Sequence, residues 1–298
     1  MQSADFLSAV FFYLKEGENL NQNWIVENLN NAFSTWNGKL GELWGLVTTG
    51  PQTFKGGAVW SVMQTLHNGM VGIGYALVVL FFAISLCKNT MNFHELKRPE
   101  AAIHYFLRFV AAKALVGYGM DIMLNVFSIC NGIVTDMADS MGGISEAMVS
   151  LPAEMQTAIE NVGFLASIPL WLVTILGSLL ITVLSFVMIL TVYGRMFKLY
   201  MYTAIAPIPL ATFAGEPTQS VGKNFIRSYA GVCLEGAIIA LACIIFSVFA
   251  SSPPAIGDTS LSAVTIVWNY VGELVFNLLV LVGAVKASDR IVKEIMGL

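Results

Sequence analysis

The sequence is short of charge. Charged residues make up only 11% of its 298 residues, whereas soluble domains carry roughly 25%. With 56% hydrophobic residues and a mean hydropathy of +0.73, the chain has too few polar groups to cover a water-facing surface. We therefore expect an integral membrane protein and not a soluble enzyme. The net charge of −4 is too small to indicate any partner.

Sequence signatures of catalysis are also missing. The chain has no GxxxxGK[ST] phosphate loop, which argues against ATP hydrolysis, and neither HExxH nor a GxSxG elbow. The three histidines are scattered without metal-ligand spacing. The four cysteines lie in apolar runs and form no CxxC pair, which favours a role as small apolar fillers. We expect no catalytic residues, no cofactor and no metal.

Long apolar runs dominate the chain from residue 70 onwards. Each is close to or above the roughly 20 residues that a helix needs to span a bilayer. The runs cover residues 70–87, 109–134, 164–193, 228–250 and 261–285. They predict an all-α polytopic membrane helix bundle with about five transmembrane helices. We accordingly expect an N-terminal extracytoplasmic region, residues 1–69, and a transmembrane helical domain, residues 70–298.

The N-terminal region has the pattern of an amphipathic helix. Its residues 19–34 are polar and rich in Asn. Apolar residues then recur at the spacing of one helix face: Leu29, Phe33, Trp36, Leu40, Leu43 and Val47. Three tryptophans, Trp24, Trp36 and Trp44, suit a membrane interface. The helix could lie on the bilayer or on a partner subunit, or pack on its own membrane domain, and the sequence leaves these alternatives open.

The distribution of basic residues predicts the orientation. Lys and Arg cluster in residues 88–100, in residues 195–227 and in the C-terminal tail, whereas residues 135–163 and 251–260 contain none. The positive-inside rule places the basic segments in the cytoplasm. This holds for all of them if residues 196–214 do not cross the membrane. We therefore expect the N-terminus outside and the C-terminus in the cytoplasm.

A proline-rich segment interrupts the helical pattern. Pro207 and Pro209 each remove a backbone donor, and each disfavours helical angles at the residue before it, Ala206 and Ile208. Broken backbone at membrane depth is tolerated where protein or a water-filled cavity covers it. We expect a re-entrant segment or a hairpin on the cytoplasmic side, with a proline-kinked sixth span as the alternative.

Polar side chains fall inside the expected spans at helical spacing. Such a group costs at least about 2.5–3.5 kcal/mol at the bilayer centre, so it should face the bundle interior, a partner subunit or water. Lys113, Gly117, Asp121 and Asn125 follow at four-residue steps, which predicts one helix face. Lys113 is a candidate for a buried ion pair with Asp121 or Glu273. The candidates for a hydrated path or a subunit seam are Lys113, Asp121, Asn125, Glu235, Asn269, Glu273 and Asn277.

Residues 193–215, YGRMFKLYMYTAIAPIPLATFAG, carry a resemblance to a known family. An Arg195-x-Phe197-Lys198 entry followed by an APIPLA turn resembles the TrbL-like polytopic channel subunit of conjugative type IV secretion systems, in the form found in integrative and conjugative elements of Gram-positive bacteria. The expected spans, the outer N-terminus and the cytoplasmic C-terminus agree with that family's layout. Residues 1–60 carry no match to it.

The resemblance implies a function. Members of this family assemble as homo-oligomers in the bacterial cytoplasmic (inner) membrane and help to move single-stranded DNA with its relaxase, or effector proteins, across it. The implied partners are membrane lipid, other secretion-system subunits, cytoplasmic ATPases and the transient DNA or relaxase cargo. The broken segment would meet the ATPases or shape the cytoplasmic mouth of the conduit; its residues are Arg195, Lys198, Pro207, Pro209 and Gly215.

Three other functions compete with this interpretation. A small-molecule permease would need a compact pocket near the membrane midplane and would take up solute as the purified protein, but the chain shows no inverted repeat of broken helices. A membrane anchor without a conduit would tolerate apolar residues in place of the polar stripes. A membrane-embedded enzyme lacks a visible nucleophile, base or metal constellation.

Overall fold

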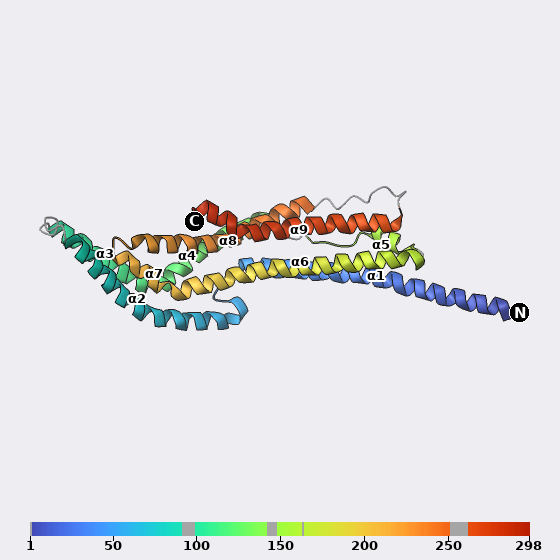
Figure 1. Cartoon of the computed structure of the whole chain (residues 1–298), viewed down its shortest axis with the longest axis horizontal. Helices are drawn as coiled ribbons and strands as arrows, with labels where there is room; N and C mark the ends of the chain where they lie inside the picture. Colours follow the sequence, from blue (N-terminus) through green and yellow to red (C-terminus); the bar gives the residue numbers. More distant parts are fainter. Residues whose placement is uncertain (1, 91–98, 142–147, 163, 251–261) are drawn as a thin grey trace. The chain divides into compact units, whose positions relative to one another are not determined.

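The computed structural model describes residues 2–90, 99–141, 148–162, 164–250 and 262–298. Within these ranges the chain is helical and contains no strand, so the predicted all-α fold is confirmed. Figure 1 labels the helices along the chain. Their bounds are α1 (Gln2–Thr48), α2 (Ala58–Thr90), α3 (Pro99–Gly117), α4 (Gly119–Met141), α5 (Ala153–Glu160), α6 (Phe164–Ile205), α7 (Pro207–Ala211), α8 (Gln219–Ala250) and α9 (Ala263–Met296).

Four of the described helices are long and apolar enough to cross a membrane. They provide candidate spans at Phe54–Lys88, Ser167–Ile205, Gln219–Phe249 and Val264–Met296. A fifth candidate is the bent pair Ile103–Gly117 and Gly119–Asp139. The prediction of a polytopic bundle with about five spans is therefore confirmed.

The helices form two compact units. Unit 1 contains Met1–Trp44, Gly142–Thr191 and Ala242–Lys286, and unit 2 contains Gly45–Met141, Val192–Leu241 and Ala287–Leu298. The predicted division at residue 69 concerns the side of the membrane on which residues 1–69 lie. Helix packing does not test that division, which stays a prediction.

In unit 1, the apolar face of α1 is buried against the protein itself. The side chains of Leu29, Phe33 and Trp36 are at most 2% exposed. Asn37 anchors the helix, because its amide Nδ2 donates to the Val149 carbonyl at 2.8 Å and its Oδ1 accepts from the Val149 N–H at 2.9 Å. Packing on its own domain is therefore the alternative that the structure supports. The alternative that this face lies on the bilayer surface is wrong, and so is the expectation that Trp36 lies at the membrane interface.

In unit 2, the expected continuous span over residues 109–134 is broken. Helix α3 ends at Gly117, α4 begins at Gly119, and the two axes differ by 70°. Glycines flank this bend, where kinks are common. They also leave room for other helices: a Cβ atom on Gly117 would lie 2.8 Å from the Tyr75 hydroxyl, and one on Gly119 would lie 3.1 Å from Leu210 Cδ1. The prediction of one helix face from Lys113 to Asn125 is therefore wrong.

The predicted break at the prolines is confirmed, but its backbone differs from the expectation. Helix α6 ends at Ile205, and a short helix, α7, starts at Pro207. Ala206 keeps helical angles (φ −48°, ψ −39°), so the expectation that Pro207 would displace it is wrong. Proline at the first position of a helix needs no N–H partner and has a suitable φ. No candidate span among the described residues includes the segment after Ile205, so the structure does not support a sixth crossing.

The turn after α6 packs tightly on α2, and this contact makes a testable prediction. A Cβ atom on Gly74 would lie 2.9 Å from Val116 Cγ1 and 3.0 Å from the Pro207 carbonyl oxygen. Gly74→Ala should therefore destabilise the protein by about 1–3 kcal/mol through overpacking, measured as the thermal unfolding midpoint in detergent. A Cβ atom on the neighbouring Gly72 would meet nothing within 4 Å. Gly72→Ala should be neutral or stabilising, and equal losses in the two variants would contradict the packing described.

Candidate functional site: exposed polar helix faces and a buried ion-pair cluster

The polar residues predicted inside the spans lie mostly on the surface of the protein. Lys113, Asp121, Asn125, Asn269 and Glu273 are exposed, Asn277 is half-buried, and Glu235 is buried. The exposed groups therefore have no place in the interior of this subunit. In a membrane they need a partner subunit, a water-filled space or the headgroup region, because lipid tails cannot solvate them.

The buried ion pair expected between Lys113 and Asp121 is wrong. Lys113 and its two suggested partners, Asp121 and Glu273, are all exposed. Within the described ranges no ion pair joins Lys113 to Asp121. The bend after Gly117 is the physical reason, because it removes Lys113 from the helix face that Asp121 occupies.

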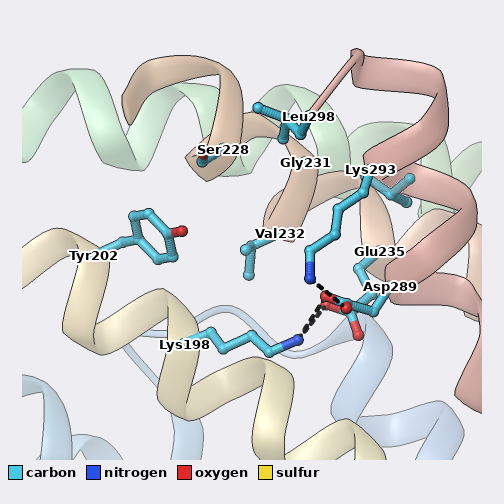
Figure 2. Close-up of a pocket in the computed structure, with 10 residues that line it drawn as sticks. Lys198, Tyr202, Ser228, Gly231, Val232, Glu235, Asp289, Lys293 and Leu298 are labelled. Carbon is cyan, nitrogen blue, oxygen red and sulfur yellow. Dashed lines mark hydrogen bonds and ion pairs between the residues drawn. The ribbon is translucent and has the colours of Figure 1, made fainter. Parts of the chain in front are cut away.

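A charged cluster connects three helices of unit 2 around a pocket of about 360 Å³ (Figure 2). Lys198 comes from α6, Glu235 from α8, and Asp289 and Lys293 from α9. Figure 2 shows both lysines pointing toward the two carboxylates. Asp289 accepts from Lys198 at 2.8 Å with Oδ1 and from Lys293 at 2.7 Å with Oδ2. One carboxylate thus links α6 to the C-terminal part of α9.

Glu235 is the least satisfied member of this cluster. Its side chain is only 2% exposed, and Lys198 Nζ lies 3.5 Å from its Oε2. That distance makes an ion pair, but Oε2 accepts no hydrogen bond from any described residue. Glu235 therefore depends on the charge of Lys198, which forms its shorter contact with Asp289.

Arg195 is buried in the same unit and connects α6 to α8. Its side chain is 1% exposed. Nε donates to the Val232 carbonyl at 3.3 Å, and Nη2 donates to the Cys233 carbonyl at 3.4 Å. The lack of a side chain on Gly236 makes room for the guanidinium, because a Cβ atom there would lie 2.5 Å from Arg195 Cζ. In this conformation Arg195 cannot touch a partner protein directly, although its position in the basic segment suggested that it could.

The other residues of the broken segment are also largely packed away. Pro207 and Gly215 are buried and Pro209 is half-buried, whereas Lys198 belongs to the charged cluster. The charged residues that are exposed near this turn come shortly after it: Glu216, Lys223 and Arg227. In the turn itself, the apolar side chains of Ile205 and Ile208 are also exposed. Any contact between this turn and a cytoplasmic protein would therefore use these exposed side chains.

Sequence reasoning missed three polar side chains that hold unit 2 together. His67 Nδ1 lies 2.6 Å from the Thr203 carbonyl, the Tyr200 hydroxyl donates to the Pro51 carbonyl at 2.7 Å, and the Tyr229 hydroxyl donates to the Met123 carbonyl at 2.9 Å. Each residue lies in or next to an apolar run. That position was the available signal, because a buried Tyr or His needs a hydrogen-bond partner.

These features define a polytopic α-helical membrane protein that presents polar groups on the outside of membrane-spanning helices. The chain belongs to the family of TrbL/VirB6 plasmid conjugal transfer like proteins, whose sequence profile matches residues 36–207, more than half of the chain. The resemblance noted over residues 193–215 is thereby confirmed at the level of the family. The expectation that residues 1–60 carry no match to it is wrong for residues 36–60. No curated protein and no solved structure matches the chain significantly.

Membership of this family gives the protein its class of function. It is a component of a conjugal transfer, type IV secretion machine, and it lies in the inner membrane as a multi-pass protein. The family comprises structural secretion-system components. Membrane lipid and other subunits of the machine are the partners that this membership implies.

Proposed function

We propose that this subunit forms or scaffolds the conduit through which a conjugative machine moves DNA and protein across the cytoplasmic membrane. The observation that carries the proposal is the exposure of Asp121, Asn125, Asn269 and Glu273 on helices of candidate spans. If these side chains of α4 and α9 met only lipid, each would destabilise the inserted protein, a charged one at the bilayer centre by at least about 2.5–3.5 kcal/mol.

A homo-oligomer supports such a conduit better than a single copy. Helices α6, α8 and α9 bury many side chains, and the pocket of about 360 Å³ between them in unit 2 has the size of a small-molecule site. A ring of copies could enclose a wider space, with the exposed polar groups directed inward or used at the seams between subunits. The same groups would then be satisfied by water or by a neighbouring copy.

The cytoplasmic side of the conduit would lie at the turn that follows Ile205. The candidate span Ser167–Ile205 has 39 residues, well beyond the roughly 20 that cross the hydrocarbon core. Its last part and the exposed Lys223 and Arg227 can therefore project into the cytoplasm, with the N-terminus of the chain outside. Cytoplasmic ATPases of the machine would contact this basic surface.

Gene deletion and complementation test the proposal. A clean deletion in the donor should abolish transfer, the wild-type gene should restore it, and Glu273→Leu should lower transfer about tenfold or more because a polar path or seam group is lost. Phe276→Leu is the matched control, since Phe276 is 59% exposed on the same helix and carries no charge. Membrane levels of each variant are measured in parallel. Unchanged transfer after deletion would refute the proposal.

A further inference from the structure

Helix α4 carries a mainly polar exposed face. Its polar residues and Gly132 recur mostly at spacings of three and four and so lie on one side of the helix. They are Asp121, Asn125, Ser128, Gly132, Thr135, Asp136 and Asp139. Two apolar residues, Ile129 and Ile133, are also exposed and border this face. With 23 residues, α4 is about 34 Å long, close to the roughly 30 Å thickness of the hydrocarbon core.

Packing on the opposite side of α4 fixes the direction of this polar face. The side chains of Met123, Phe127 and Val134 are at most 5% exposed. The Tyr229 hydroxyl of α8 donates to the Met123 carbonyl at 2.9 Å, and the Arg195 guanidinium lies 6.0 Å from the centre of the Phe127 ring. Because the apolar side is held in the protein interior, α4 cannot turn its polar side inward without losing these contacts.

We propose that this face of α4 lines a water-filled path through the assembled machine. This inference rests on the proposed conduit function and names the surface that would provide it. Lipid is an unfavourable neighbour for the part of the face inside the expected span, because Asp121 places a carboxylate there. Asp136 and Asp139 extend the face into the stretch expected outside the membrane. A two-fold seam between copies is also unfavourable, since it would place like charges opposite one another on a face without Lys or Arg.

The chemistry of the face suits passage better than retention. Carboxylate, amide and hydroxyl groups hydrogen-bond to water. They offer no cation to neutralise phosphates, and affinity for a nucleic acid rises with each phosphate that a protein neutralises. A hydrated polymer could therefore move along α4 without binding tightly to it.

Thiol labelling of the full-length protein in donor membranes tests the inference. In a background where the exposed Cys87 is replaced by Ser, Asn125→Cys and Ser128→Cys should react with a charged, membrane-impermeant methanethiosulfonate reagent about tenfold or more faster than Ile133→Cys. Ile133 is the matched control, because it is 39% exposed and lies on the flank of α4 away from Ser128. Bulky adducts at residues 125 and 128 should also lower DNA transfer.

Each outcome decides the inference. Absence of labelling at residues 125 and 128 would place the face against lipid or a protein seam and overturn it. Labelling with unchanged transfer would place the face in bulk water outside the path and also overturn it. Failure of the conduit function itself gives a different result, namely unchanged transfer after gene deletion.

Discussion

Gly236→Ala should strongly destabilise the packing of α6 on α8. A Cβ atom at residue 236 would lie 2.5 Å from Cζ and Nη2 of Arg195 and 2.6 Å from its Nη1. The guanidinium is 1% exposed and is held by two α8 carbonyls, so it cannot move aside freely. Overpacking of this kind costs about 1–3 kcal/mol and occasionally more. The expected readout is a lower thermal unfolding midpoint in detergent and less folded protein in the membrane.

Two comparisons isolate the contact between Arg195 and Gly236. Gly272→Ala serves as the matched control, because a Cβ atom there would meet nothing within 4 Å and should leave the midpoint nearly unchanged. In an Arg195→Met background, the flexible side chain leaves room for the new methyl group, so Gly236→Ala should cost less. An equal cost in both backgrounds would show that the guanidinium does not fill the space at Gly236.

Lys198→Met should produce the second large effect, by leaving Glu235 buried without its nearest cation. Breaking a buried ion pair costs about 3–5 kcal/mol. Lys198 is 38% exposed, and water screens part of its charge, so we expect a loss of about 1–3 kcal/mol. The measurement is again the unfolding midpoint, compared in one detergent at constant pH and ionic strength.

Substitutions at Glu235 and Lys293 test whether the loss of stability comes from the unpaired Glu235 carboxylate. Glu235→Gln removes the buried negative charge, so the double variant with Lys198→Met should be more stable than Lys198→Met alone. Lys293→Met is the control, because Lys293 is 57% exposed and its ion pair joins it to Asp289 and not to Glu235. A double variant that loses the sum of the two single costs would contradict the dependence of Glu235 on Lys198.

The helical spans could be predicted because apolar runs of sufficient length have few alternatives in a membrane. The break within the second run could not. Gly117 and Gly119 permit a bend, but the residues that pack against the bend, Tyr75 from α2 and Leu210 from α7, lie far away in sequence. Helical periodicity assumes a continuous helix axis. The spacing therefore placed Lys113, which lies in α3, on the same face as Asp121 and Asn125, which lie in α4.

Burial of individual residues was also beyond the sequence. The basic segment around Arg195 predicted a solvated cytoplasmic position. Its burial depends on the carbonyls of Val232 and Cys233 and on the space at Gly236, all of which become neighbours only when α8 packs on α6. Conversely, the spacing of the apolar residues in α1 correctly predicted that they share one helix face. That spacing did not determine which surface covers the face.

The sequence predicted which residues of the candidate site are polar, but not which of them are buried. Spacing identified Asp121 and Asn125 as polar residues in a span, but the two explanations, a hydrated path or interhelical contacts, require opposite burial. Exposure on α4 favours a partner or water over contacts within the subunit. Glu235 instead makes an interhelical contact, because it is buried on α8 and forms an ion pair with Lys198 of α6.

Direct contact between the subunit and the moving DNA tests the conduit most directly. Donor cells are fixed with formaldehyde during active transfer, the subunit is precipitated, and the bound transferred strand is quantified against a chromosomal control sequence. The account predicts enrichment of the transferred strand with the wild-type protein, and loss of that enrichment when the machine's ATPases are inactivated. Undiminished transfer without any enrichment of the strand would contradict a path that runs along this subunit.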